Sequence, residues 1–479
     1  LYADPKHIFN PEEVASALLP YVPKLDKPTL IKRLTKKGRF TELDRKLTPK
    51  RHSAILQLGL PGIYVKPATI RIYPQGREAA HIIGAVDRDN NGIAGIEKSQ
   101  NETLASGENV YLSIDTGLQT ILRESLDTQI KTFEALGGAA LILDVKTGEI
   151  MAATSLPDFD PNHIMTSTDT ARFNQVTKGV YEMGSIFKIL NTAIALETGA
   201  IDMQATIDVS KPIRVAGQLI DDYHPIKGSI GLAEILVRSS NIGSAHISQL
   251  IGSETQKNYM KQLGLLSASP LEIVENGVPL VPQNWSHITT MTVSYGYGLS
   301  VSMVQAAAAI AAAGGDGHYI APTLLRRNAN EPIEKLRIFS TETSMAVRSM
   351  MRLVVSNKLG TGNFADAPGY LVGGKTKKKK KVENKGFNRK ANRVSFVATF
   401  PANDPAYLIM MMVDEPIGQK HSYNYATAGW VVAPAIKEVV NQIAPILGVH
   451  PVDITKPENS QNLLPPIMLD GKETVYASF

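Results

Sequence analysis

The sequence predicts an α+β fold with more than one domain, for three reasons. A chain of 479 residues has room for two to four domains with a sizeable core. The first 110 residues carry only short helical and strand-like segments, whereas the remainder carries long apolar helical stretches. That remainder also holds a strand hairpin and three later strand-like runs separated from it by helices, a mixture typical of α+β chains.

Composition indicates a globular protein, because 43% of the residues are hydrophobic and 20% are charged. No uninterrupted apolar stretch reaches the roughly 18 residues of a membrane span. Cysteine is absent, which excludes a disulfide framework and thiolate chemistry and fits an oxidising compartment. The chain begins at Leu1 without a methionine or signal peptide, so we expect a trimmed sequence that has lost an upstream anchor.

The net charge of +5 comes from one local feature, the five consecutive lysines Lys377–Lys381. Without them the formal balance is 5 − 5 = 0, so the remaining charges predict no distributed basic patch. No aromatic interleaving and no nucleic-acid-binding motif accompanies the run. We therefore expect a solvated loop at these lysines and no nucleic-acid partner.

The N-terminal segments alternate between short helices and short strands. The apolar spacing predicts helices at residues 11–15, 30–34 and 49–58 and strands at residues 63–65 and 69–73. Asp89-Asn90-Asn91-Gly92 is a strong turn signal. We place the domain boundary near residues 105–112, which divides the chain into residues 1–110, residues 111–450 and a loosely ordered tail of residues 451–479.

The second domain begins with a strand at residues 109–114, and Asp115 and Thr116 are suited to cap the helix that follows. An apolar stripe from Leu118 to Phe133 predicts that helix. Residues 139–144 and 149–153 then read as a hairpin of half-buried strands.

The later elements follow from the same patterns. Predicted helices lie within residues 230–250, where residues 238–241 break a pair, and at residues 303–313 and 433–443; predicted strands lie at residues 370–376, 394–400 and 407–413. The glycine-rich segment 295–300 does not indicate a phosphate-binding loop, because no strand precedes it and no correctly spaced third glycine follows.

The stretch Tyr181-Glu182-Met183-Gly184-Ser185-Ile186-Phe187-Lys188 opens a nearly all-apolar helix that runs to Gly199. Lys188 lies one helical turn after Ser185, on the same face. A serine hydroxyl needs a nearby base to become a nucleophile at neutral pH. A desolvated lysine supplies one, because burial lowers its pKa and leaves a neutral amine.

Two further polar signals follow in order, Ser239-Ser240-Asn241 and then Gly374-Lys375-Thr376 at the end of a strand. Alone, the first is typical of a helix cap and the second of a solvated strand end. Together with Ser185-x-x-Lys188 they match a combination found in penicillin-binding proteins and active-site serine β-lactamases. The order and the wide spacing make the set far more specific than any member.

The chain resembles the class B penicillin-binding proteins, which are peptidoglycan DD-transpeptidases, and is most similar to their division-specific FtsI type. Stretches outside the three motifs that carry the resemblance are residues 40–48, 71–74, 81–84, 92–97 and 222–225. The resemblance implies a transpeptidase domain with a central antiparallel sheet flanked by helices, and an elongated N-terminal pedestal. It also implies a location at the periplasmic face of the bacterial inner membrane, through a single-pass anchor absent from this chain.

The resemblance also implies a role for each site residue. Ser185 would attack the penultimate D-alanine of a stem peptide, and Lys188 would be its base. Ser239 would relay a proton to the leaving amine, and Asn241 would hold the substrate amide or Lys188. The substrate carboxylate would bind to Lys375 and Thr376, and the backbone N–H groups of Ser185 and Lys378 would form the oxyanion hole.

No cofactor or metal is implied. The implied partners are peptidoglycan stem peptides, β-lactams as covalent inhibitors, a division glycosyltransferase and other divisome proteins.

One departure from the family stands in the third motif, where Lys377 replaces the glycine of Lys-Thr-Gly. Glycine lets the strand backbone approach the substrate, whereas a lysine would intrude or twist the strand. A non-catalytic penicillin-binding scaffold or sensor is therefore the alternative function. A serine β-lactamase is a weaker one, since no Glu-x-x-Leu-Asn signature is present and the pedestal would be superfluous. Met183 replaces the proline common before Gly-Ser, a milder change.

Overall fold

The computed structural model describes the chain except residues 216, 384–385, 454–466, 470–471 and 475–479. For residues 218, 378–383, 386–391, 467–469 and 472–474 it describes the backbone alone. Two compact units are present. Unit 1 comprises Leu1–Tyr73 and Arg88–Asn90, and unit 2 comprises Pro74–Asp87 and Asn91–Phe479. The boundary at residue 110 stays a prediction.

Unit 1 packs three short helices on a small sheet. The helices are α1 (Pro11–Leu18), α2 (Lys27–Leu34) and α3 (Pro49–Gln57), and the sheet has the order β2 (Thr41–Glu42), β1 (Tyr2–Ala3), β3 (Ile63–Tyr64). Each helix begins at a side-chain cap, from Asn10, Asp26 and Thr48, with proline in its first turn. The predicted strand at residues 69–73 is wrong, because among the described residues no strand lies between β3 and β4 (Ala85–Val86).

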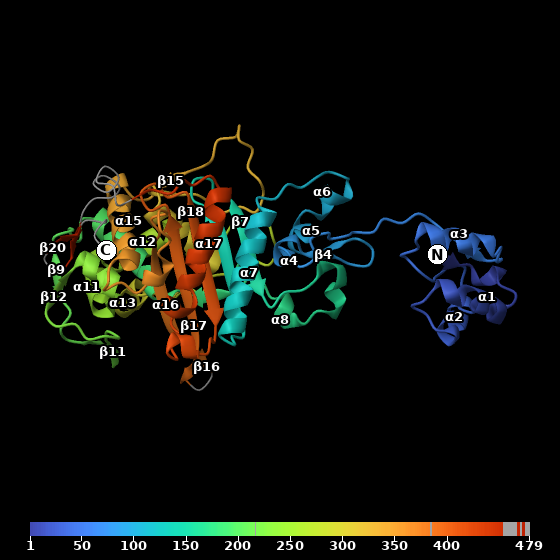
Figure 1. Cartoon of the computed structure of the whole chain (residues 1–479), viewed down its shortest axis with the longest axis horizontal. Helices are drawn as coiled ribbons and strands as arrows, with labels where there is room; N and C mark the ends of the chain where they lie inside the picture. Colours follow the sequence, from blue (N-terminus) through green and yellow to red (C-terminus); the bar gives the residue numbers. More distant parts are fainter. Residues whose placement is uncertain (216, 384–385, 454–466, 470–471, 475–479) are drawn as a thin grey trace. The chain divides into compact units, whose positions relative to one another are not determined.

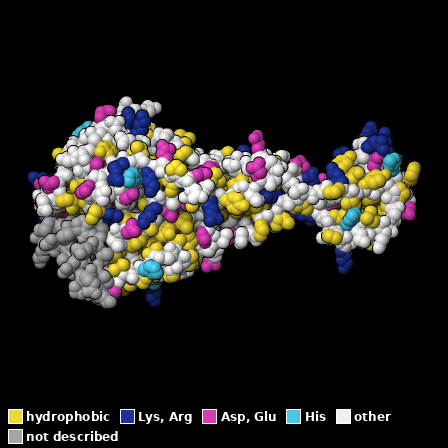
Figure 2. All heavy atoms as spheres, turned by 90° about the horizontal axis from the view of Figure 1, so that it is seen from above, with side chains coloured by type: hydrophobic (Ala, Val, Ile, Leu, Met, Phe, Trp, Pro, Cys, Tyr) yellow, Lys and Arg dark blue, Asp and Glu magenta, His cyan; other side chains and the backbone are white. Residues whose placement is uncertain are grey.

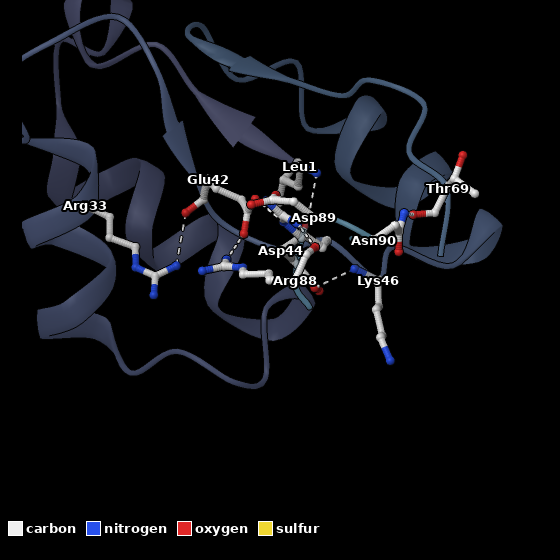
Figure 3. A network of polar contacts seen from close by, with 10 residues as sticks. Leu1, Arg33, Glu42, Asp44, Lys46, Thr69, Arg88, Asp89 and Asn90 are labelled. Carbon is white, nitrogen blue, oxygen red and sulfur yellow. Dashed lines mark hydrogen bonds and ion pairs between the residues drawn. The ribbon is translucent and has the colours of Figure 1, made fainter. Parts of the chain in front are cut away.

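A polar network ties the Arg88–Asn90 turn into unit 1 (Figure 3). Arg88 pairs with Glu42, and Asn90 donates to the Thr69 carbonyl oxygen over 2.7 Å. The amino group of Leu1 donates to the Asp44 carbonyl oxygen at 2.7 Å. Exposed ion pairs of this kind stabilise by only about 0–1 kcal/mol each, so they orient the turn more than they hold the unit together.

Unit 2 is built on one five-stranded, fully antiparallel sheet (Figure 1). Its strands, in spatial order, are β16 (Gly373–Glu383), β17 (Gly386–Phe400), β18 (Tyr407–Asp414), β6 (Gly137–Asp144) and β7 (Ile150–Leu156). β16 therefore lies at one edge of this sheet. The predicted hairpin is confirmed, since Leu141 lies opposite Ala153 in the β6–β7 pair.

Helices cover both faces of this sheet, as predicted. One face packs on α7 (Thr116–Thr132) and α17 (Ala433–Ile446), which cross in front of the strands in Figure 1. The other packs on α9 (Lys188–Glu197), α14 (Met303–Gly314) and α15 (Thr341–Ser356). Because both faces are covered, neighbouring residues such as Met410 and Met411 are both buried, in opposite core clusters. This explains the nearly continuous apolar runs of the central strands.

Several other elements of unit 2 match the sequence. Asp115 caps α7, and the broken pair at residues 230–250 is α10 (Leu232–Arg238) followed by α11 (Asn241–Ile251). The predicted strand at residues 109–114 is wrong, because only an isolated bridge between Leu112 and Leu325 forms there. Most of the predicted tail, residues 451–479, lies outside the described residues.

Unit 2 contains further elements beyond this sheet and its helices. Near its start lie α4 (Ala80–Ile83), β4 (Ala85–Val86), β5 (Gly92–Ala94), α5 (Gly95–Ser99) and α6 (Asn101–Ala105); later come α12 (Ser253–Gln262), α13 (His287–Ser294) and α16 (Ala428–Val431). On the face seen in Figure 2, Lys and Arg side chains are interspersed with Asp and Glu side chains. None of the helices described is long and apolar enough to cross a membrane.

Candidate active site

Ser185 lies in a tight turn that joins a short strand to a buried helix. The strand β8 (Val180–Glu182) leads into the 3-10 turn η4 (Gly184–Phe187), and α9 begins at Lys188. Gly184 has a φ of +54°, a backbone conformation that glycine adopts freely. The glycine between β8 and Ser185 therefore allows the chain to turn sharply.

The glycine-rich segment 295–298 packs against this turn and is hydrogen-bonded to it. The Gly184 N–H donates to the Gly296 carbonyl oxygen at 2.9 Å, and a Cβ at Gly296 would lie only 2.1 Å from the Gly184 oxygen. Next to it, β13 (Ser300–Ser302) pairs with β8. The segment therefore supports the serine turn through close backbone contact, a role that the sequence pattern did not reveal.

Lys188 is buried at the centre of a polar cluster. Its Nζ lies 3.3 Å from the Ser185 Oγ and 2.7 Å from the Asn241 Oδ1. The same atom lies 3.2 Å from the Ser239 Oγ and 2.5 Å from the Ser239 carbonyl oxygen. The structure thus brings together four of the predicted site residues, which come from the serine turn and from the junction of α10 and α11.

Burial holds the pKa of Lys188 well below its ordinary value, because the ammonium form loses its hydration. The positive charge of Lys375 lowers the pKa further, and the carboxylate of Asp222 acts in the opposite direction. A lysine in this setting can hold a neutral amine near neutral pH and accept a proton from a neighbouring hydroxyl.

Ser239 ends α10 in the left-handed backbone conformation, with a φ of +64°. Non-glycine residues seldom adopt this conformation, and strain of this kind clusters at functional sites. It directs both polar oxygens of Ser239 toward Lys188. Asp222, which precedes α10 in the chain, accepts hydrogen bonds from the start of α11. The sequence drew attention to residues 222–225 only as a resemblance and assigned Asp222 no role.

Lys375 lies on β16, which packs against the serine turn. Its side chain is fully buried, and its Nζ has no hydrogen-bond partner among the residues that the structure describes. Burial lowers the pKa of Lys375 to about 7. The next residue, Thr376, shares a hydrogen bond of 2.5 Å with the Thr361 hydroxyl. The edge strand β16 therefore carries a buried lysine whose amine has no described hydrogen-bond partner, next to a threonine whose hydroxyl is hydrogen-bonded to Thr361.

Lys377 is also buried, with 2% of its surface exposed. Its side chain packs along Gly184, where an added Cβ would lie 3.0 Å from the Lys377 Cγ. Burial lowers the pKa of Lys377 to about 7, and the nearby charge of Arg393 lowers it as well, against Asp414. The lysine in the glycine position thus occupies space directly beside the residue that precedes the serine.

The predicted solvated loop at the lysine run is wrong, because Lys377–Lys381 continue β16 and their backbone pairs with β17. Lys378 pairs with Val394 across β17, so the strand is present at the position predicted to supply an oxyanion donor. The side chain of Lys378 lies outside the described residues. Among those described, no group of three or more His, Asp or Glu side chains is arranged to hold a metal ion.

Comparison with known proteins decides the family. Residues 138–438 match the penicillin binding protein transpeptidase domain. The chain belongs to this family. Residues 1–124 match the penicillin-binding protein dimerisation domain, which overlaps unit 1. The predicted family, fold class and enzyme class are therefore confirmed.

Two relatives illustrate the match. The chain is 35% identical over 461 residues to the probable peptidoglycan D,D-transpeptidase FtsI of Caulobacter vibrioides, which covers 94% of this chain and 78% of the relative. It is 27% identical over 455 residues to the peptidoglycan D,D-transpeptidase FtsI of Escherichia coli K12, with coverage of 89% and 75%.

Solved structures agree. Penicillin binding protein 3 of Mycobacterium tuberculosis, complexed with aztreonam, superposes with a TM-score of 0.73 at 25% identity, covering 80% of this chain and 92% of that one. The transpeptidase domain of penicillin-binding protein 3 of Burkholderia pseudomallei gives 0.64 at 30% identity, with coverage of 71% and 97%. This D,D-transpeptidase family fits a site built on a serine and a buried lysine.

Proposed function

We propose that the chain crosslinks peptidoglycan stem peptides through an acyl-enzyme on Ser185, with Lys188 as the base. One observation carries the proposal: the buried Lys188 Nζ lies 3.3 Å from the Ser185 Oγ, while burial depresses the lysine pKa. Geometry and charge state both suit removal of the hydroxyl proton.

The reaction takes place in two steps. In the first, the Ser185 Oγ attacks the carbonyl carbon of the penultimate D-alanine, and the C–N bond to the terminal D-alanine breaks. The hydroxyl proton passes through Lys188 to the leaving nitrogen, so the terminal D-alanine departs as a free amine that still carries its carboxylate. In the second step an amine of another stem peptide attacks the ester, which frees Ser185 and leaves the crosslink as an amide.

Ser239 and Asn241 support the proton transfer in this scheme. The Ser239 Oγ, 3.2 Å from the Lys188 Nζ, is placed to pass the proton toward the leaving amine. Asn241 was predicted to hold either the substrate amide or Lys188. Its Oδ1 accepts a hydrogen bond from Lys188 at 2.7 Å, while its Nδ2 donates to the Asp221 carbonyl oxygen. These contacts favour the role of holding Lys188.

β16 supplies the binding groups. Lys375, buried without a described partner, would attract the carboxylate of the terminal D-alanine. The Thr376 hydroxyl, oriented by Thr361, would bind the same carboxylate. The backbone N–H groups of Ser185 and Lys378 would form the oxyanion hole. Stabilising the developing negative charge in this way usually accelerates acyl transfer more than any other single effect.

A catalytic role is favoured over a non-catalytic scaffold, because the cluster around Lys188 is complete. Relatives named FtsI further support a role in septal wall synthesis at the periplasmic face of the inner membrane. A division glycosyltransferase and other divisome proteins are the partners that such a role requires.

Incubation with a labelled penicillin tests the proposal. We expect one acyl group per chain, located at Ser185 by peptide mass analysis, and no label on the Ser185→Ala variant, since that variant lacks the nucleophile. Ser106→Ala, which removes an exposed hydroxyl, is the matched control and should label normally. With a D-alanyl-D-alanine peptide and an acceptor amine, the enzyme should release D-alanine. Label that persists on Ser185→Ala would refute the assignment.

A further inference from the structure

Asp222 makes a compact set of hydrogen bonds at the start of α11. One carboxylate oxygen accepts from the Ser240 hydroxyl at 2.6 Å. The other accepts from the backbone N–H groups of Asn241 at 2.5 Å and Ile242 at 3.1 Å. The side chain is nearly inaccessible to solvent, with 8% of the residue exposed. A buried carboxylate that accepts three hydrogen bonds is firmly oriented.

These bonds determine the shape of the turn that faces Lys188. The Ser240 Oγ also accepts from the Gly243 N–H at 2.9 Å, so Ser240 connects Asp222 to the first turn of α11. Asn241 is bound through its backbone N–H to Asp222 and through its side chain to Lys188. Asp222 thereby keeps the Asn241 side chain and the left-handed Ser239 in register with the lysine amine.

The same carboxylate is also part of the electrostatics of Lys188. The serine turn and the α10–α11 junction face the amine with hydroxyl, amide and carbonyl groups. The charged groups that act on it are Lys375 from β16 and Asp222. Their effects oppose each other, because Lys375 disfavours the ammonium form and Asp222 favours it. A general base works best when its pKa stays near the working pH. The negative charge of Asp222 opposes the effect of Lys375 and so preserves the base strength of Lys188.

We infer that Asp222 is a positioning residue for acylation, which holds the Ser239–Asn241 turn against Lys188 and balances the charge of Lys375 there. The inference rests on the proposed roles of Ser185 and Lys188. It assigns Asp222 two separable effects, one of shape and one of charge.

Two substitutions separate these effects. Asp222→Asn removes the charge, but its carbonyl oxygen still accepts from the two backbone N–H groups and its amide can donate to the Ser240 Oγ. Asp222→Ala removes both charge and acceptors. Asp222→Glu keeps the charge, and Asp221→Asn is the matched control, because it removes one charge from the exposed neighbouring side chain.

The main measurement is the titration of Lys188 by NMR on protein labelled at the lysine ε-carbon, assigned with a Lys188→Arg variant and recorded without penicillin. Asp222→Asn should move the Lys188 midpoint to lower pH, and Lys375→Met should move it to higher pH. Asp221→Asn should leave the Lys188 midpoint unchanged. Asp222→Glu, which keeps the charge, should have a midpoint close to that of the unsubstituted protein. The acid limb of penicillin acylation should shift with the NMR midpoint.

The rates distinguish shape from charge. Asp222→Asn should lower the plateau acylation rate by about three- to tenfold, the loss expected of a weaker base. Asp222→Ala should lower it by about 100-fold, within the range for misplaced catalytic groups. An unchanged Lys188 midpoint in a folded Asp222→Asn protein would overturn the inference. Because the titration needs no acylation, it measures the effect of Asp222 on Lys188 even if Ser185 proves not to be the nucleophile.

Discussion

Lys188 and Lys375 are both buried lysines of one site, but their surroundings differ. The Lys188 amine lies within hydrogen-bond distance of oxygens from Ser185, Ser239 and Asn241. The Lys375 amine has no such partner in the part of the chain that the structure describes. Burial lowers the pKa of both side chains.

The two lysines therefore differ in whether their hydrogen-bond partners are already in place. Lys188 has its partners before any substrate arrives, which suits a base that must be held in one position. Lys375 has lost its hydration without compensation, which is costly for a charged group and leaves it ready to bind an anion. These surroundings support the proposed roles, chemistry for Lys188 and substrate recognition for Lys375.

Substituting Lys188 should produce the largest effect. We expect Lys188→Ala to reduce the second-order rate of penicillin acylation by about 10³–10⁴-fold, because the serine loses its base. Stopped-flow or gel-based labelling over a range of penicillin concentrations measures this rate. Retention of more than a tenth of the rate would show that another group serves as base and that the two lysines do not differ as described.

Removing Lys375 should affect recognition and stability in opposite directions. Lys375→Met should slow acylation by about 10- to 100-fold, as expected when a charge-assisted hydrogen bond to the carboxylate is lost. It should also stabilise the protein at pH 6 by about 1–3 kcal/mol, because a buried charge is replaced by an apolar side chain of similar length.

The sign of the pH dependence follows from the pKa of Lys375, which is about 7 in the folded chain against an ordinary value of 10.5. Between these values the unfolded chain binds a proton that the folded chain does not, so the stability contribution of this group rises with pH. The advantage of Lys375→Met should therefore be full at pH 6 and small at pH 10. Thermal unfolding at both pH values checks this. A variant that is less stable at pH 6 would contradict the description of Lys375 as uncompensated.

The smallest expected effect concerns Lys377, which packs on Gly184 next to Ser185. We expect Lys377→Gly to accelerate acylation by about tenfold, less than the ~10²–10³-fold attributed to one complete oxyanion donor. The reason is that the bare backbone would leave room beside Ser185 for the substrate.

Lys380→Gly is the control, because it removes the same charge from the same strand three residues further along β16. Acylation rates at matched, moderate salt give the comparison. A slower Lys377→Gly enzyme would mean that the lysine supports the serine turn instead of crowding it.

Local pattern was enough to predict much of this protein. The spacing of Ser185 and Lys188, the Asp115 cap and the hairpin at residues 139–153 all depend on neighbours within a few turns of the chain. Strand predictions failed at residues 69–73 and 109–114, where β-branched and aromatic residues are present but these described segments form no ladder of paired strands. Strand propensity is realised only when another segment supplies the hydrogen bonds.

By itself, then, the sequence determined the order of the three motifs, the family they indicate and the residues proposed to carry the chemistry. The tertiary structure alone decided how those residues meet. It placed Gly296 against Gly184, Asp222 under the Asn241 turn and Lys377 along the serine turn. Each of these contacts joins residues at least 19 positions apart, and local periodicity says nothing of such pairs. The tertiary structure also decided the charge states of the lysines. Desolvation and the distances between charges shift the pKa of a lysine, and both are set only when the chain folds.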